Sequence, residues 1–433
     1  MAIPVAAAAL AFTSAASAAT TQPVVYTPTD STTLQTDIST ADGAAPGNLS
    51  IIQLCGCSYQ PTESLPLSGN IEITGPPTFQ SQLDVNQDPD ISGGVVFNLS
   101  PAVPLFVINP GANILFKGFD LTNGGNGEGV GSVEVIGGNI ELDNMAVSGS
   151  LGSAMVLQEG SATLANTSVT GGVADGIEQN GTATVTLLSD TFSYNGLGAI
   201  EGPNISSYNT LFDKNAQGGG AGACGQLGTA GDTFVDDYSN DSSCGTSGVT
   251  VSTLVSRDTN LSGFYGGPTL TAQLKTGNPA IGHGLPQYCP TADQRFFLYT
   301  QGSGGTCDVG SYQTTGVQDT STTGPTCTIA SVNESTDPTV PSMETVNAAE
   351  ASGIGIGADG VNYTITNNGT VSYPVSGSSW FNATSPSLTI DPAYPSTSAY
   401  PVTAAKPVGD LTVNDTKWSF YASDWLGNTT YCN

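Results

Sequence analysis

The feature that most constrains this chain is a short phrase repeated at a period of roughly 22 residues. The phrase LDNMAVSGS (142–150) returns as LANTSVTGG (164–172) and as LLSDTFSYN (187–195), and looser copies follow at 206–215 and 228–237. Aligned on one apolar position, the five copies carry Val147, Val169, Phe192, Phe212 and Phe234. A unit this short cannot bury its own apolar side, so each copy has to stack on its neighbours.

Within each unit, apolar and polar residues alternate between Gly and Asn corners, which is typical of short strands. One strand-bearing unit per turn predicts a parallel β-helix in which the aligned apolar position points inward. A weaker copy at 117–125 adds Leu121 to this position. Three residues before the apolar position, a second position predicts a column of residues at a corner of the coil. An amide tolerates the left-handed backbone of such a corner, and its side chain can bond to the next coil. The residues at this position are Asn144, Asn166, Ser189, Asn209 and Gly231. The alternative is a meander of antiparallel hairpins, which has no reason to keep a regular period.

The charge balance excludes some classes of partner. The chain has 36 acidic residues against seven Lys and Arg, for a formal net charge of −29. Only 10% of its residues are charged, against about 25% in a typical soluble protein. Seven scattered bases cannot form a basic patch, so we expect neither nucleic-acid binding nor attraction to an anionic membrane surface.

The chain divides into four segments by pattern. Residues 1–18 predict a secretory signal peptide with an Ala-Ser-Ala cleavage site, although no Lys or Arg precedes the apolar run, and a buried N-terminal helix is the alternative. Residues 19–313 predict the β-helix, which a short helix with Leu34 and Ile38 on one face would cap. Residues 314–326 predict a linker and 327–433 a small β-sandwich. No stretch is long and apolar enough for a transmembrane helix.

Eight cysteines in an exported chain predict disulfide bonds. The domain division favours pairing neighbours in sequence. Cys224 with Cys244 and Cys289 with Cys307 would each close a local loop, and Cys327 with Cys432 would join the ends of the last domain. Cys55 and Cys57 remain, either paired with each other or bound elsewhere. Metal binding is the alternative, but a single histidine and no CxxC pair argue against zinc.

Residues 278–313, NPAIGHGLPQYCPTADQRFFLYTQGSGGTCDVGSYQ, resemble the closing motif of bacterial choice-of-anchor Q domain proteins. The matching residues are Pro279, Ala280, Ile281, Gly284, Cys289, Asp293, Gln294, Arg295, Cys307, Asp308 and Gly310. His283, Phe296 and Phe297 depart from the motif. The resemblance implies a right-handed parallel β-helix of the pectate-lyase-like type over about residues 31–313. The final hairpin, SFYASDWLGNTTYC, is similar to that of bacterial Ig-like modules, which implies an Ig-like fold for the last domain.

Arg295 is one of few bases, and we expect it to pair with Asp293 or Asp308 and hold the closing motif together. The functional alternative is a catalytic or sugar-binding arginine. His283, the lone histidine, has no nucleophile motif beside it and is interpreted as a surface residue.

Catalysis has a small set of candidate residues. A hydrolase needs convergent carboxylates, and Asp175, Glu178 and Glu201 are the best candidates because Glu178 and Glu201 lie one coil apart. Their alternative is ordinary strand and corner sequence with solvated acids. A lyase needs a Lys or Arg base, or calcium held by carboxylates, yet Lys117, Lys214, Arg257 and Lys275 show no acid cluster beside them in a repeated register. A loose acidic set could bind calcium, with no other cofactor expected: Asp232, Asp236, Asp237 and Asp241.

We therefore predict an all-β fold, a right-handed parallel β-helix followed by a small β-sandwich, in a secreted or cell-surface protein. The first functional hypothesis is non-catalytic adhesion or glycan binding, with an extracellular glycan or a surface protein as partner. The alternative is a carbohydrate-active enzyme, either a glycoside hydrolase or a polysaccharide lyase. A third possibility is a structural spacer that carries the last domain.

Overall fold

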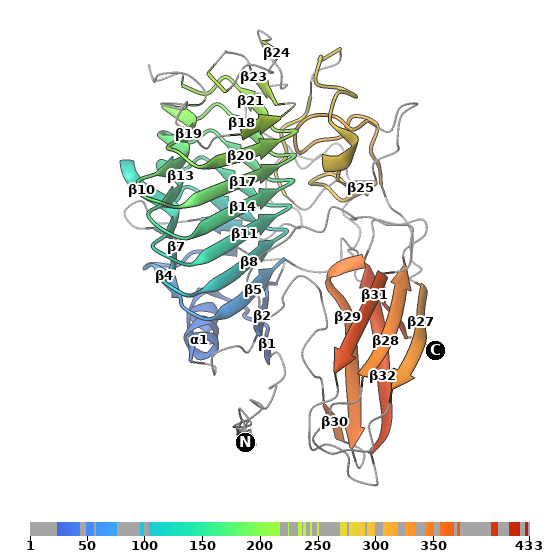
Figure 1. Ribbon diagram of the computed structural model, residues 1–433. Helices are drawn as coiled ribbons and strands as arrows, with labels where there is room; N and C mark the ends of the chain where they lie inside the picture. Colours follow the sequence, from blue (N-terminus) through green and yellow to red (C-terminus); the bar gives the residue numbers. More distant parts are fainter. Residues whose placement is uncertain are drawn as a thin grey trace, which may run out of the picture.

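The described part of the chain consists of a three-sided coil followed by three antiparallel sheets, as seen in a computed structural model (Figure 1). The structure describes residues 24–43, 49–55, 58–75, 96–98, 104–125, 127–216, 224, 233–235, 237–239, 243–244, 249–250, 269–274, 277–290, 292–298, 306–318, 326–333, 343–349, 356–367, 370–372, 400–405, 415–424 and 429–431. The predicted signal peptide lies outside these residues. Among the described residues, no helix combines the length and the apolar character needed to cross a membrane.

Three parallel sheets form the sides of the coil, and six successive turns of the described chain each give one strand to every sheet. Sheet A contains β1 (Val24–Tyr26), β2 (Leu49–Gln53), β5 (Asn70–Thr74), β8 (Asn113–Lys117), β11 (Asn139–Asp143), β14 (Ser161–Ala165), β17 (Thr184–Leu188), β20 (Ile205–Tyr208) and β22 (Thr233–Val235). Sheet B contains β3 (Ser58–Tyr59), β6 (Val96–Asn98), β9 (Asp120–Thr122), β12 (Ala146–Ser148), β15 (Ser168–Thr170), β18 (Thr191–Ser193), β21 (Leu211–Asp213), β23 (Tyr238–Ser239) and β24 (Val249–Thr250). Sheet C contains β4 (Leu65–Leu67), β7 (Phe106–Ile108), β10 (Gly127–Val135), β13 (Gly152–Leu157), β16 (Asp175–Gln179) and β19 (Gly198–Glu201). The predicted parallel β-helix is confirmed.

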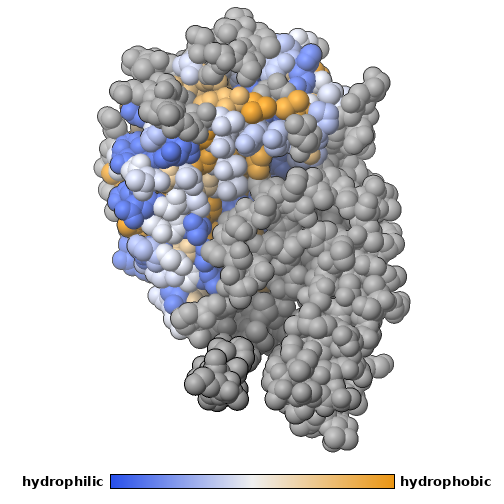
Figure 2. Space-filling view, in the orientation of Figure 1, coloured by the Kyte–Doolittle hydropathy of each residue, from blue (hydrophilic) through white to orange (hydrophobic). Residues whose placement is uncertain are grey.

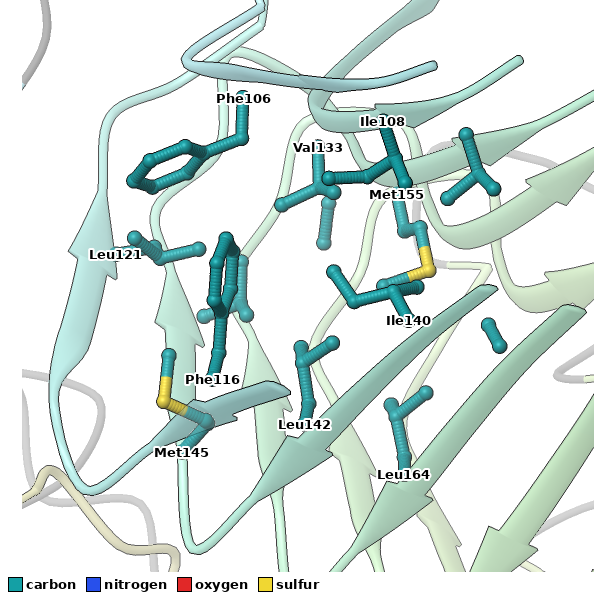
Figure 3. Packing of buried hydrophobic residues seen from close by; sticks show 14 of the residues in the cluster. Phe106, Ile108, Phe116, Leu121, Val133, Ile140, Leu142, Met145, Met155 and Leu164 are labelled. Carbon is teal, nitrogen blue, oxygen red and sulfur yellow. The ribbon is translucent and has the colours of Figure 1, made fainter. Parts of the chain in front are cut away.

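The interior is built from columns of residues that stack from coil to coil. In sheet B, the register places Leu121, Val147, Val169, Phe192 and Phe212 in one column, as the repeat predicts. In sheet A, the corresponding inner column runs through Ile73, Phe116, Leu142, Leu164 and Leu187. Figure 3 shows side chains from the three sheets meeting in this interior. Because every coil adds residues to the same columns, the apolar core is continuous along the axis.

The fifth copy of the repeat does not place its phenylalanine in the predicted column. Phe212 pairs with Ser239 in sheet B, so Phe234 does not continue that column. Phe234 instead lies on β22 and pairs with Ser207 in sheet A, although it still packs against the core and contacts the ring of Phe212. Phe212 and Ser239 are 27 residues apart, whereas the steps from Val147 to Phe212 are 20 to 23 residues. A fixed period therefore stops too early, at a phenylalanine on the sheet A strand of that coil.

The predicted corner column is confirmed in its backbone conformation. Asn144, Asn166, Ser189 and Asn209 all have positive φ, between 49° and 55°. A left-handed residue turns the chain sharply from sheet A to sheet B, and Asn accepts this conformation more readily than most residues do. Gly231 lies outside the described residues.

The predicted capping helix is α1 (Ser31–Asp42), which lies against the first coils (Figure 1). Asp30 caps its N-terminus in a reciprocal arrangement with Thr33, and Leu34, Ile38 and Ala41 are buried. At its other end, Asp42 Oδ1 accepts hydrogen bonds from the backbone N–H groups of Ser68 and Gly69. The helix therefore shields the apolar interior of the first coil from solvent.

Beyond the coil, the strands pair antiparallel. Strand β25 (Phe297–Leu298) pairs with β26 (Val317–Gln318), so the first residues of the predicted linker pair with the segment that closes the coil. A three-stranded sheet contains β27 (Thr326–Asn333), β28 (Met343–Ala349) and β31 (Tyr400–Ala405). A four-stranded sheet contains β29 (Ile356–Asn367), β30 (Thr370–Ser372), β32 (Asp415–Asp424) and β33 (Thr429–Tyr431). These sheets have the strand content of a small sandwich, and the Ig-like assignment stays a prediction.

Candidate functional site

The predicted acid pair is brought together on sheet C. Glu178 of β16 pairs in register with Glu201 of β19, so the two side chains start from neighbouring strands at the same height. Strands in a sheet lie about 4.8 Å apart, a spacing that suits a pair of catalytic carboxylates. Asp175 pairs with Gly198 rather than with another acid, and its side chain is buried. The register therefore brings together two of the three candidates.

Glu178 holds neighbouring parts of the coil in place. Its Oε2 accepts a hydrogen bond from the backbone N–H of Gly129 at 2.8 Å and another from the Ser153 hydroxyl at 3.0 Å. Its Oε1 accepts a bond from the Asn180 side-chain amide at 2.8 Å. Gly129 belongs to β10 and Ser153 to β13, so one carboxylate connects three consecutive strands of sheet C. This is the bonding of a structural acceptor.

A second acidic group lies on the outer face of sheet A, where no site was predicted. Glu141 and Asp143 alternate on β11 with the inward residues Ile140 and Leu142, so both carboxyl groups point away from the core. Asp143 pairs in register with Lys117 of β8. Only 1% of Glu141 and 7% of Asp143 is exposed to solvent. Lys117 thus has one acid, Asp143, beside it in register, and Glu141 lies two residues before that acid.

Burial shifts the proton affinity of both groups. Burial raises the pKa of Glu141 from 4.5 to about 8, and the charge of Asp143 contributes in the same direction. Burial raises the pKa of Asp143 from 3.8 to about 7, while the positive charge of Lys117 opposes this rise. Carboxyl groups whose pKa lies near neutrality can take up or release a proton under ordinary conditions, which is the property of an acid–base site.

A sequence signal for this group existed. Lys117 and Asp143 have the same offset as Leu121 and Val147, the first two members of the repeat alignment. The copies at 117–125 and 142–150 therefore already place Lys117 opposite Asp143.

The closing segment, defined here as residues 269–318, lies along the side of the coil. The backbone N–H of Leu270 donates to Asp120 Oδ1 on β9, and the N–H of Ser311 donates to the Thr191 hydroxyl on β18. Further along the axis, the Asn209 side chain donates to the Leu285 carbonyl and accepts from the Leu285 N–H. The segment therefore spans several coils along the side, where the resemblance had implied a closure at the end.

The corner column provides much of this attachment. Asn144 donates to the Asp293 carbonyl, and Ser189 donates to the Tyr288 carbonyl. We expected the corner side chains to bond to the next coil. The residues directly after the corner make these bonds between coils instead. Asp190 Oδ1 accepts a hydrogen bond from the Thr167 N–H, and Asp237 Oδ1 accepts one from the Thr210 N–H, both at 2.7 Å. The corner amides lie at the edge of the coil and are accessible to the closing segment.

Arg295 takes the structural role expected of it. It forms an ion pair with Asp293, and its Nε donates to Asp293 Oδ2 at 2.8 Å. The guanidinium lies over the rings of Phe297 and Tyr312, at 4.1 and 3.8 Å from their centroids. The side chain is 5% exposed. Arg295 thus holds both sides of the closing segment together.

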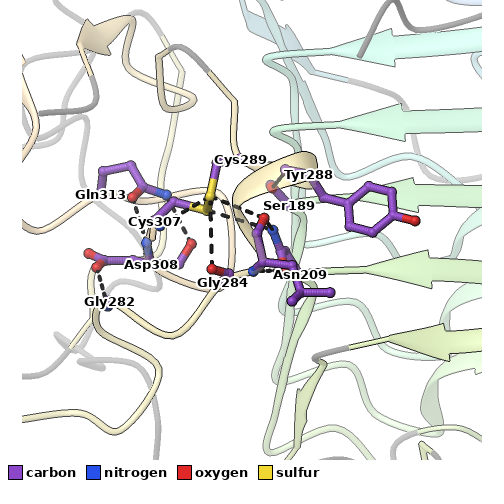
Figure 4. Close-up of a disulfide and its surroundings, with 10 residues drawn as sticks. Ser189, Asn209, Gly282, Gly284, Tyr288, Cys289, Cys307, Asp308 and Gln313 are labelled. Atoms are coloured by element: carbon purple, nitrogen blue, oxygen red, sulfur yellow. Dashed lines mark hydrogen bonds between the residues drawn. A yellow bond between two sulfur atoms is a disulfide. The ribbon is translucent and has the colours of Figure 1, made fainter. Parts of the chain in front are cut away.

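Two predicted disulfides are present. Cys224 bonds to Cys244, and Cys289 bonds to Cys307 within the closing segment (Figure 4). Cys55 is also disulfide-bonded. Cys57 and Cys432 lie outside the described residues, and of Cys327 only the backbone in β27 is described, so the pairing of Cys327 with Cys432 stays a prediction.

The remaining candidates show no assembled centre. His283 is exposed, with its ring 6.3 Å from that of Tyr238. Of the predicted calcium-binding acids, Asp237 is buried beside Thr210, and the other three lie outside the described residues. Within the described ranges, no group of three or more His, Cys, Asp or Glu side chains is arranged to hold a metal ion.

Comparison with known proteins finds a likeness among solved structures. No family model matches the chain, and no curated protein matches it. Among solved structures, the chain is similar to the pectate lyase Pel9A, with 13% sequence identity and a TM-score of 0.35. The match covers 68% of this chain and 97% of that structure. Likeness at this level gives no information about activity.

Proposed function

We propose that this chain is an exported, non-catalytic β-helix protein that serves in adhesion or glycan binding at or outside the cell surface. The observation that carries the proposal is the bonding of Glu178, the central member of the predicted catalytic set. Its carboxylate accepts three hydrogen bonds from Gly129, Ser153 and Asn180, which fix strands of the coil. Arg295, the other residue with a possible sugar-binding role, is buried in the closing segment.

A second candidate function rests on the group around Lys117. Glu141 and Asp143 have pKa values near neutrality, and Lys117 lies beside Asp143 in register. A carbohydrate-active enzyme, either a hydrolase or a lyase, could use such groups as acid and base. Their burial on the outer face of sheet A opposes this function, because a polysaccharide would have to reach side chains that are almost fully shielded.

The purified chain would be tested against a panel of plant and bacterial polysaccharides, with and without calcium, for retention on the immobilised glycan and for release of reducing ends. Retention without release supports the proposal. Release that is lost in Glu201→Gln, a substitution at the less engaged member of the sheet C pair, contradicts it and identifies a hydrolase. Release that is lost in Lys117→Met and Glu141→Gln, but not in Glu201→Gln, identifies the second candidate. If the chain is neither retained on a glycan nor releases reducing ends, both candidate functions are contradicted.

A further inference from the structure

The outer face of sheet A has a shielded half and an open half. On β5, β8 and β11, the outward residues Glu72, Leu115, Glu141 and Asp143 are buried, while the remaining outward residues at the strand ends are partly exposed. From β14 onward, the outward residues are partly or fully exposed while the inward ones remain buried, as the alternating burial of β14, β17 and β20 shows. Figure 2, in the orientation of Figure 1, shows pale, weakly polar atoms over these strands. The open half is therefore a solvent-facing surface of regular construction.

Hydroxyl groups form two rows on this open half. The register aligns Thr163, Thr186, Ser206 and Thr233 in one row and Ser161 with Thr184 in the other. Thr184 and Thr233 are exposed, and the other four are partly exposed. We call these six residues the hydroxyl face. Its members recur at the strand spacing of about 4.8 Å, which is close to the length of one hexose unit in an extended glycan chain.

An apolar row runs beside the hydroxyl rows. Ala165, Leu188 and Tyr208 follow one another in register, and each is partly exposed. The Tyr208 ring stacks on Tyr288 of the closing segment, with centroids 4.3 Å apart. A sugar ring has hydroxyl groups at its edge and C–H groups on its faces. Hydroxyl rows beside an apolar and aromatic row offer partners to both, because aromatic side chains combine apolar contact with a polar edge.

The charge of the surface selects the class of glycan. The outward residues of β14, β17 and β20 include no charged side chain. The chain as a whole carries a formal net charge of −29, which repels uronates, sulfated sugars and other anionic polymers. A neutral polymer meets no such repulsion and can exchange hydrogen bonds with threonine and serine hydroxyls, which both donate and accept.

The backbone holds these hydroxyls in place before a ligand arrives. Each strand of the open half is bonded to the next through a continuous parallel register from β14 to β22. The inward residues Leu164, Val185, Leu187 and Ile205 are buried in the core directly beneath. A rigid row of groups loses little conformational freedom on binding, which favours affinity for a regular polymer.

We propose that the hydroxyl face binds an uncharged polysaccharide that lies along the axis of the coil. This inference rests on the proposed glycan-binding function and assigns to it a surface and a ligand class. The site is separate from the Glu178–Glu201 pair, which lies on sheet C. Specificity would come from the repeat distance of the polymer matching that of the strands.

The test compares binding of neutral polysaccharides, such as cellulose, xylan and mannan, with that of anionic ones, such as polygalacturonate and chondroitin sulfate. The probe variant is Thr186→Val with Ser206→Ala, which removes two neighbouring hydroxyls and keeps the strands intact. Thr184→Glu is a second variant, because Thr184 is exposed and the new charge sits on the open face. The matched control is Thr62→Val, the same change at an exposed position far along the chain from the hydroxyl face.

We expect the unmodified chain to bind at least one neutral polymer and to prefer it over the anionic ones. Both face variants should bind that polymer roughly tenfold more weakly or not at all, because two hydrogen bonds are lost or a charge is added, and Thr62→Val should bind normally. Unchanged binding in folded face variants, or a preference for anionic polymers, would overturn the assignment of the face and leave glycan binding in place. If the unmodified chain binds no glycan, the proposed function fails and this inference fails with it.

Discussion

Lys117 and Asp143 lie side by side on adjacent strands of sheet A, one coil apart, with Asp143 almost fully shielded from solvent. The positive charge of Lys117 opposes the effect of burial on the pKa of Asp143. Glu141, two residues before Asp143, is more deeply buried and has a higher pKa, about 8. Such carboxyl groups make the stability of the coil depend on pH in the direction opposite to that of ordinary surface ion pairs.

We predict that the free energy of unfolding decreases as pH rises from 5 to 8. A carboxyl whose pKa is raised in the folded state binds its proton more tightly when the chain is folded. Its contribution to stability is therefore complete below the pKa of the unfolded state, about pH 4, and is lost as pH rises through the pKa of the folded state. Between the pKa of the unfolded state and that of the folded state, each such group lowers the free energy of unfolding by about 1.4 kcal/mol per pH unit. Urea unfolding at several pH values measures the slope, and Glu141→Gln should flatten it. An unchanged slope in the variant would show that Glu141 does not titrate in this range.

We predict that the two members of the sheet C pair differ in their effect on stability. Glu178→Ala removes the acceptor for the Gly129 N–H and the Ser153 hydroxyl, so it should lower stability by roughly 2–3 kcal/mol. Glu201→Ala should change stability by less than about 0.5 kcal/mol, because Glu201 is partly exposed. Thermal unfolding of both variants provides the comparison. Equal, small effects would mean that Glu178 does not fix the strands.

A buried hydroxyl in the core should be replaceable with a gain in stability. Ser207 occupies the inner column after Leu142, Leu164 and Leu187, and its Oγ has no hydrogen-bond partner. Ser207→Ala should therefore raise stability by about 1 kcal/mol, since an unsatisfied buried hydroxyl is costly. Ser206→Ala, the next residue on the outer face, is the control and should be close to neutral. A loss of stability in Ser207→Ala would indicate that the hydroxyl has a partner.

Loss of the disulfide of the closing segment should destabilise that segment more than it destabilises the coil. Cys289 and Cys307 are separated by 18 residues, and closing a loop of this size contributes about 3 kcal/mol. In Cys289→Ser with Cys307→Ser, limited proteolysis should cut the closing segment early while the coil up to β21 remains resistant. Early cleavage within β14–β20 instead would show that the closing segment supports the coil itself.

The sequence indicated the parts of the structure that depend on local pattern. The period of the repeat predicted the coil and the column from Leu121 to Phe212, and the Asn and Ser positions predicted its left-handed corners. Leu34 and Ile38 predicted the buried side of the capping helix. Close spacing along the chain predicted the disulfides of Cys224 and Cys289 with their partners. These features follow from alternation, backbone preference and short loops, all of which a single sequence displays.

Only the tertiary structure decided which strand Phe234 enters, how deeply Asp143 is buried beside Lys117, and where the closing segment packs. Each depends on contacts between residues far apart in the chain, such as Asn209 with Leu285 or Asp120 with Leu270. The lengths of the loops between strands set the register of the last coils, and a regular period does not record those lengths. Likewise, the sequence alone does not distinguish whether a glutamate such as Glu178 or Glu141 faces solvent, holds three strands together or keeps a proton at neutral pH. Its surroundings decide among these roles, and folding assembles them from several coils.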